Sequence, residues 1–85
     1  MDILTKLICV YNNKSESANS NLAKQLLAHL NEIPHISIYE LAYICYTSTT
    51  AISRFVRRLE YENFHQFKSV LSATLNYYPQ YNRKM

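Results

Sequence analysis

Residues 37–59 limit the possible folds more than any other part of this 85-residue chain. They begin with an S-x-x-E pattern, in which the side chains of Ser37 and Glu40 satisfy free backbone N–H groups at a helix start. Apolar residues then recur at helical spacing until a polar break, which ends at Ser48, a residue favoured as an N-cap. The stretch therefore predicts two short helices joined by a tight turn, over about residues 38–45 and 49–60.

The second of these predicted helices has two chemically different faces. Its apolar face is formed by Ile52, Phe55, Val56 and Leu59. Its other face carries hydroxyl and guanidinium groups, on Thr49, Thr50, Ser53, Arg54 and Arg57. A helix that reads base edges in the major groove needs such a face, because Thr contacts a thymine methyl or either base type and Arg grips guanine through two hydrogen bonds. The stretch is therefore a candidate helix-turn-helix with these side chains facing the bases, and we expect one of the two arginines to reach a base and the other a phosphate.

Three motifs follow one another in and after this stretch. They are S-I-x-E-L-A from Ser37, S-R-F-x-R-x-L from Ser53 and F-x-x-F-K from Phe64. In this order they resemble the N-terminal domain of the RpiR (ribose phosphate isomerase regulator) family, without a gap over about residues 22–71. The resemblance implies an all-α fold, a five-helix bundle with a homeodomain-like three-helical core and additional helices at both ends. It also implies the DNA-binding domain of a bacterial transcriptional regulator.

Two residues depart from the family pattern at places where the chain must turn. Tyr46 occupies the turn position where glycine is usual, and Glu60 replaces the glycine that usually ends the reading helix. A residue with a Cβ in the left-handed conformation costs on the order of 1 kcal/mol relative to glycine. Either the helix ends differently in this chain, or tertiary packing carries the strain.

A second group of side chains is predicted to contact the DNA backbone. It consists of Ser37, Tyr39, Ser48, Arg58 and Lys68. Ser37 also serves as a helix cap, and the two roles are compatible. For Arg58 an intramolecular pair with Glu62 is the alternative, and for Arg54 the alternative is a salt bridge or a solvated position.

The rest of the chain predicts three further helices. The first covers about residues 1–11, and the polar residues 12–21 are interpreted as a loop. Ser20 is expected to cap a second helix that runs to about Glu32 and is stopped by Pro34. A fifth helix over about residues 64–77 follows Asn63 as its N-cap. The tail, residues 78–85, is interpreted as flexible or as the start of a linker.

Charge and composition restrict the function. Residues 1–50 contain three lysines against four acidic residues, whereas residues 51–85 contain six basic against two acidic residues, so the positive charge begins within the reading helix. No Gly-rich phosphate loop and no nucleophile–base pair is present, so no enzyme, catalytic residue or cofactor is expected. Cys9 and Cys45 lack metal-ligand spacing and are interpreted as buried reduced thiols. Without a membrane span or signal pattern, a cytoplasmic location is expected.

The resemblance also sets the expected domain organisation and partners. Residues 1–77 are predicted to form the helix-turn-helix domain, with double-stranded operator DNA and a second copy of the chain as partners. The sugar isomerase (SIS) domain through which the family senses a phosphorylated sugar is absent, so the chain is either the N-terminal domain alone or a short form. The alternative function is a helical interaction or dimerisation module without specific DNA binding. Salt dependence separates the two, because phosphate contacts give a steep slope and an apolar interface a nearly flat one.

Overall fold

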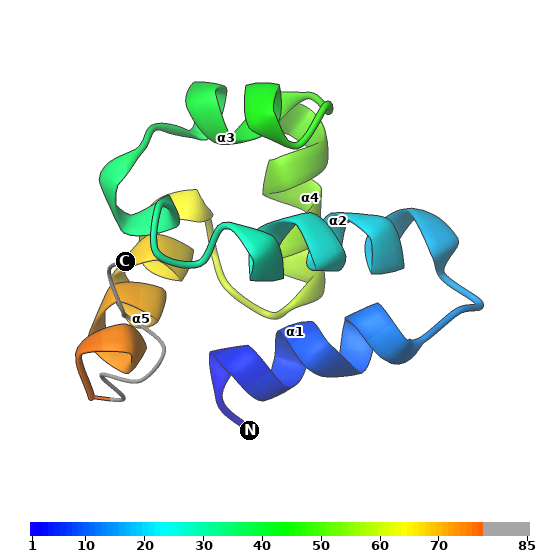
Figure 1. The fold of residues 1–85 in the computed structure, drawn as a ribbon, viewed down its shortest axis with the longest axis horizontal. Coiled ribbons are helices and arrows are strands. Elements are labelled where there is room, and N and C mark those ends of the chain that lie inside the picture. The colour runs from blue at the N-terminus through cyan, green and yellow to red at the C-terminus, as the bar shows by residue number, and fades with distance from the viewer. Residues whose placement is uncertain (78–85) are drawn as a thin grey trace.

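The computed structural model describes residues 1–77. Within them it has no strand, and its helices are α1 (Ile3–Asn12), α2 (Ser17–Ala28), the 3-10 helix η1 (Ile33–His35), α3 (Ile38–Ile44), α4 (Thr49–Arg58) and α5 (Phe64–Tyr77). Helices α1 and α2 lie side by side, α3 lies across the top of the view, and α4 passes behind α2 (Figure 1). The all-α, five-helix prediction is confirmed. The predicted tail lies outside the described residues.

The predicted helix starts around the turn are confirmed by their caps. The Ser37 hydroxyl accepts a hydrogen bond from the Glu40 N–H, and the Glu40 carboxylate accepts one from the Ser37 N–H, which completes the capping box of α3. The Ser48 hydroxyl accepts from the Ala51 N–H at 3.1 Å. At α5 the Asn63 side chain accepts from the Gln66 N–H at 2.8 Å. Each cap is worth about 1 kcal/mol, so these residues fix where the helices begin.

The predicted bounds of α2 are wrong at both ends. Its first turn lies within the polar stretch interpreted as a loop, and Ser20 is a buried residue inside the helix rather than its cap. The Ser20 hydroxyl donates to the Tyr11 carbonyl at 2.6 Å, so contact with α1 extends the helix toward its N-terminus. The helix ends at Ala28, before the expected Glu32. The chain then turns into η1, which places Ile33 in the core with none of its surface exposed.

The two residues that stand where the family pattern has glycine both adopt the left-handed conformation. Tyr46 has φ 57° and Glu60 has φ 75°, and no other described residue has positive φ. After α3, the Thr47 N–H donates to Ala42 O and the Tyr46 N–H to Tyr43 O. This is the hydrogen-bond pattern of a Schellman motif, which satisfies the last carbonyls of a helix. The helix ends are therefore those of the family pattern, built without its glycine.

The exit from α4 has the same hydrogen-bond pattern and an additional contact. The Tyr61 N–H donates to Val56 O at 3.0 Å and the Glu60 N–H to Arg57 O at 2.8 Å. Lys6 of α1 donates to Leu59 O at 3.0 Å, and its ammonium lies 4.6 Å from the centre of the Tyr61 ring. Lys6 of α1 thus contacts this turn, and that packing carries the strain stays a prediction.

One hydrophobic core joins all the helices. Its largest fully buried side chains are Phe55, Phe67, Ile3, Leu7, Leu26, Ile33, Leu41, Ile52, Leu71, Leu75 and Val56. Of the predicted core of α5, Phe67, Leu71 and Leu75 are buried, and Phe64 and Val70 pack at its edge. Cys45 is buried as expected, and burial raises the pKa of its thiol. Cys9 is exposed on the outer side of α1, so its predicted burial is wrong; both cysteines are free thiols.

Candidate nucleic-acid interface

Helix α4 presents the predicted reading face to solvent. Ile52, Phe55 and Val56 hold the helix against the core. On the opposite side the side chains of Thr50, Arg54 and Arg57 are exposed, and those of Thr49 and Ser53 are partly exposed. The structure therefore brings together the five side chains predicted to face bases, although their contact with DNA stays a prediction.

Arg54 and Arg57 differ from the other basic residues of this region because neither side chain has a hydrogen bond or ion pair within residues 1–77. An arginine without a carboxylate partner loses no intramolecular interaction when it binds a base or a phosphate. Its planar guanidinium donates five hydrogen bonds in a geometry that suits both ligands. These two residues therefore supply the available positive charge of the candidate interface on α4.

Arg58 is held within the domain by a residue that the sequence did not indicate. Its guanidinium donates to both carboxylate oxygens of Glu16, at 3.1 and 2.8 Å, so the partner is Glu16 and not the expected Glu62. Asn13 and Asn19 also donate to Glu16. The hydrogen bonds from Arg58 and then Asn19 lower the pKa of Glu16 to about 2 from its usual 4.5. The same carboxylate raises the pKa of Arg58.

Lys68 is also engaged within the domain. Its ammonium donates to the Ile36 carbonyl at 2.8 Å and lies over the Phe64 ring, with 5.5 Å to the ring centre. The Ile36 carbonyl directly precedes the capping box of α3, so Lys68 joins α5 to the start of that helix. A phosphate contact by Lys68 stays a prediction, and it would have to share or replace this hydrogen bond.

The remaining predicted phosphate contacts lie at the starts of α3 and α4. The hydroxyls of Ser37 and Ser48 each accept a backbone hydrogen bond as caps, and a hydroxyl can still donate to a phosphate oxygen. The Tyr39 side chain has 74% of its surface exposed and no partner within the described residues. These three positions are therefore open to a phosphate without loss of an existing hydrogen bond.

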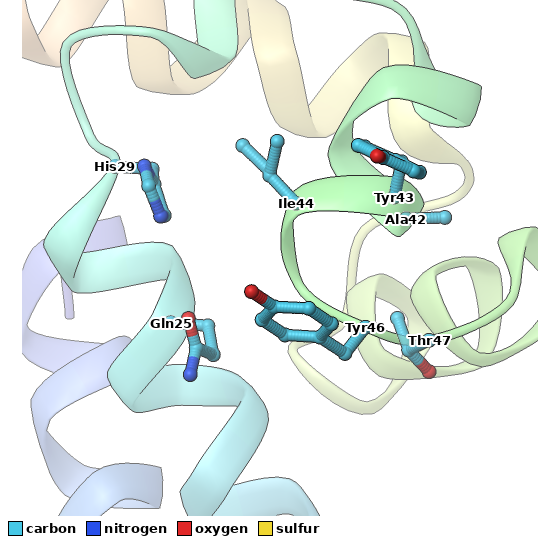
Figure 2. Close-up of a pocket in the computed structure, with 7 residues that line it drawn as sticks. All are labelled: Gln25, His29, Ala42, Tyr43, Ile44, Tyr46 and Thr47. Carbon is cyan, nitrogen blue, oxygen red and sulfur yellow. The ribbon is translucent and has the colours of Figure 1, made fainter.

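A hollow lies beside the helix-turn-helix turn, between α2 and the end of α3. Figure 2 shows its lining residues, with Gln25 on α2, His29 directly after the end of α2, and the ring of Tyr46 extending from the turn toward α2. Tyr46 is 92% exposed despite this position. The polar lining of the hollow consists of hydroxyl, amide and imidazole groups. The imidazole, on His29, already has a partner, because its Nδ1 is 2.6 Å from a carboxylate oxygen of Glu32.

Taken together, the two capped helices, the tight turn and the exposed polar face of α4 define a helix-turn-helix domain of the DNA-binding class. The family model described as a helix-turn-helix domain of the rpiR family matches residues 1–77. The chain therefore belongs to that family, whose domains bind DNA in transcription regulators and are not enzymes. No curated protein and no solved structure matches the chain. Across residues 1–77, none of the helices has the length and apolar character needed to cross a membrane.

Proposed function

We propose that this chain binds a short operator sequence specifically, as the DNA-binding domain of a bacterial regulator of sugar or sugar-phosphate metabolism genes. The observation that carries the specific binding is the exposed face of α4, on which Arg54 and Arg57 lack a partner in the described chain. Family membership supports the class of target genes. A phosphorylated sugar would act through a separate sugar isomerase domain.

The geometry of α4 gives each polar residue of the face a role. Thr49 and Thr50 stand in the first turn, the part of a reading helix that enters the major groove most deeply. Ser53 lies about one turn after these two threonines, and Arg57 lies about one turn after Ser53. Threonine methyls fit thymine, and an arginine donates to guanine O6 and N7. The proposed operator therefore includes a guanine within reach of an arginine.

Two copies of the chain are proposed to bind one operator as a dimer. Helix-turn-helix dimers place their reading helices about 34 Å apart, so the operator would be a palindrome with half-sites one helical turn apart. Protection of DNA from hydroxyl radicals measures this directly. We expect two protected half-sites at saturating protein, and a single protected half-site would contradict dimeric binding.

Fluorescence anisotropy tests the specific binding itself. The probes are a labelled duplex from the promoter of the protein's own gene and a random duplex of equal length, each at two salt concentrations. We expect tighter binding to the promoter, and a log K that falls with log salt by about 0.9 for each phosphate contacted. Absence of binding to either duplex at low salt would overturn the proposal in favour of a protein-interaction module.

The first substitution to make is Arg57→Ala. If this side chain reads a guanine, the variant loses about 1–3 kcal/mol of discrimination at one base pair and binds other sequences there equally well. Selection of bound duplexes from a random pool, with the original and variant proteins in parallel, measures this change. An unchanged preference at every position would remove Arg57 from the base contacts.

A further inference from the structure

Most basic side chains of residues 1–77 already have a partner in the domain. Lys6 binds Leu59 O, Lys14 binds Tyr11 O, Arg58 binds Glu16 and Lys68 binds Ile36 O. Within residues 1–77, the lysine and arginine side chains without such a partner are Lys24, Arg54 and Arg57. Lys24 belongs to α2, outside the helix-turn-helix, and nothing in the sequence pattern marked it as a DNA contact.

Lys24 and Arg54 line the same groove. It runs between α2 and α4, has a volume of about 650 Å³, and continues to the turn at Thr47. Amide groups of Asn21 and Gln25 also line it, and no acidic side chain does. Two cations without partners thus lie among neutral hydrogen-bonding groups. This combination suits an anion with several acceptor oxygens.

Arg54 and Arg57 share the exposed face of α4 but lie about 60° apart around its axis, and only Arg54 lines the groove. Ala51, Arg54 and Arg58 are spaced three and four residues apart and all line the groove beside α2. Arg57 does not line it, and it stands four residues, about one helical turn, after Ser53. Arg54 is therefore at the flank of the reading helix, next to α2, and Arg57 is on the outward face.

We propose that this groove binds the phosphodiester backbone of one DNA strand, with Lys24 and Arg54 as the phosphate contacts and Arg57 as the base-reading arginine. The inference rests on the proposed function. A helix inserted in the major groove has a sugar–phosphate strand along each flank, so a cationic groove beside α4 lies where a strand passes. The positive charge of the groove would suit an acidic peptide as well, and its position along the flank of the proposed reading helix is what selects a DNA strand.

Salt-dependent binding of a random 30-base-pair duplex tests the groove, because phosphate contacts need no operator. Lys24→Gln and Arg54→Gln each remove one positive charge from the groove, and Lys14→Gln removes one outside it as the matched control. We expect each groove variant to reduce the slope of log K against log salt by about 0.9 and to bind about fivefold more weakly at 0.15 M salt. The control is expected to leave both quantities unchanged. Thermal unfolding followed by circular dichroism verifies that each variant is folded.

A charge-conserving variant and a measurement of base preference complete the test. Lys24→Arg keeps the charge and is expected to restore the original slope. In selection from a random pool, Arg54→Gln is expected to leave base preference unchanged, whereas Arg57→Gln alters it. If the original protein binds DNA but both groove variants keep its slope, the groove inference is overturned and the proposed function stands. A changed base preference for Arg54→Gln also overturns it, and an original protein that binds no duplex overturns both proposals.

Discussion

At the scale of single residues, the Glu16–Arg58 pair shows how the reading helix is held. Arg58 is the last residue of α4 and Glu16 directly precedes α2, so two hydrogen bonds join the end of one helix to the start of another. An Arg–carboxylate pair with two parallel bonds fixes direction as well as distance. The pair therefore orients the end of α4 relative to α2, and with it the groove that both helices line.

This pair predicts a dependence of stability on pH. Because the folded pKa of Glu16 is lowered from 4.5 to about 2, its contribution is complete above about 4.5 and is lost as the pH falls toward 2. We expect Glu16→Gln to lower stability at pH 7 and to weaken the loss of stability between pH 4.5 and 2. Urea unfolding at a series of pH values measures both effects.

Glu62→Gln is the matched control, because Glu62 is exposed and its carboxylate has no hydrogen bond within the described residues. It should leave stability at pH 7 almost unchanged and the acid response intact. If Glu16→Gln and Glu62→Gln give the same pH profile, the Glu16–Arg58 pair does not stabilise the fold.

At the scale of elements, the two Schellman turns set the length of α3 and α4. Each turn places a residue with a Cβ, Tyr46 or Glu60, in the conformation that favours glycine. The hydrogen bonds of the motif are complete in both, so the geometry persists against the steric cost. Both helices therefore end in the motif in which glycine is favoured, with a residue that carries a Cβ in its place.

Replacement of Tyr46 tests this strain. The left-handed conformation costs about 1–2 kcal/mol for a residue with a Cβ, and the greater freedom of glycine in the unfolded chain offsets about 0.4–1 kcal/mol of that gain. We expect Tyr46→Gly to be more stable than Tyr46→Ala by about 0.5 kcal/mol or more. Both variants lose the same exposed ring, so the comparison isolates the backbone. Urea unfolding of the two proteins measures the difference, and a glycine variant less stable by the full offset of about 0.4–1 kcal/mol would show that no strain is present.

At the scale of the whole molecule, α1 completes the core on which the helix-turn-helix rests. Its inner face, formed by Ile3, Leu4, Leu7 and Val10, is buried against the other helices. Lys6 on the same helix binds the carbonyl that ends α4. The first helix therefore belongs to the folding unit and supports the candidate interface, although it lies outside the helix-turn-helix itself.

Leu7→Ala measures this contribution. Leu7 has no exposed surface, so its truncation removes apolar burial and leaves a cavity, at a cost of about 2–5 kcal/mol. Domains of this size have a total stability of about 5–15 kcal/mol, so we expect a large fall in the urea midpoint. Ile8→Ala on the same helix is the control, because Ile8 is 47% exposed. Equal losses in the two variants would contradict the packing of α1.

The sequence by itself determined the features that depend on near neighbours. Helical periodicity, the caps at Ser37, Ser48 and Asn63, and the two faces of α4 all arise from residues a few positions apart, and the structure confirms them. The family pattern located both turns where glycine is replaced. The resemblance over residues 22–71 therefore predicted the fold and the candidate reading face without information on tertiary contacts.

Only the tertiary structure decided the features that join distant segments. The first turn of α2 is polar and reads as a loop, but the contact of Ser20 with Tyr11 makes it helical. Arg58 and Glu16 are 42 positions apart, and Lys24 meets Arg54 only across a groove between two helices. No local pattern encodes such pairs, because their geometry follows from how the whole core packs. Local sequence patterns thus predicted the polar face of α4, and packing determined which of its charged side chains have no partner within residues 1–77.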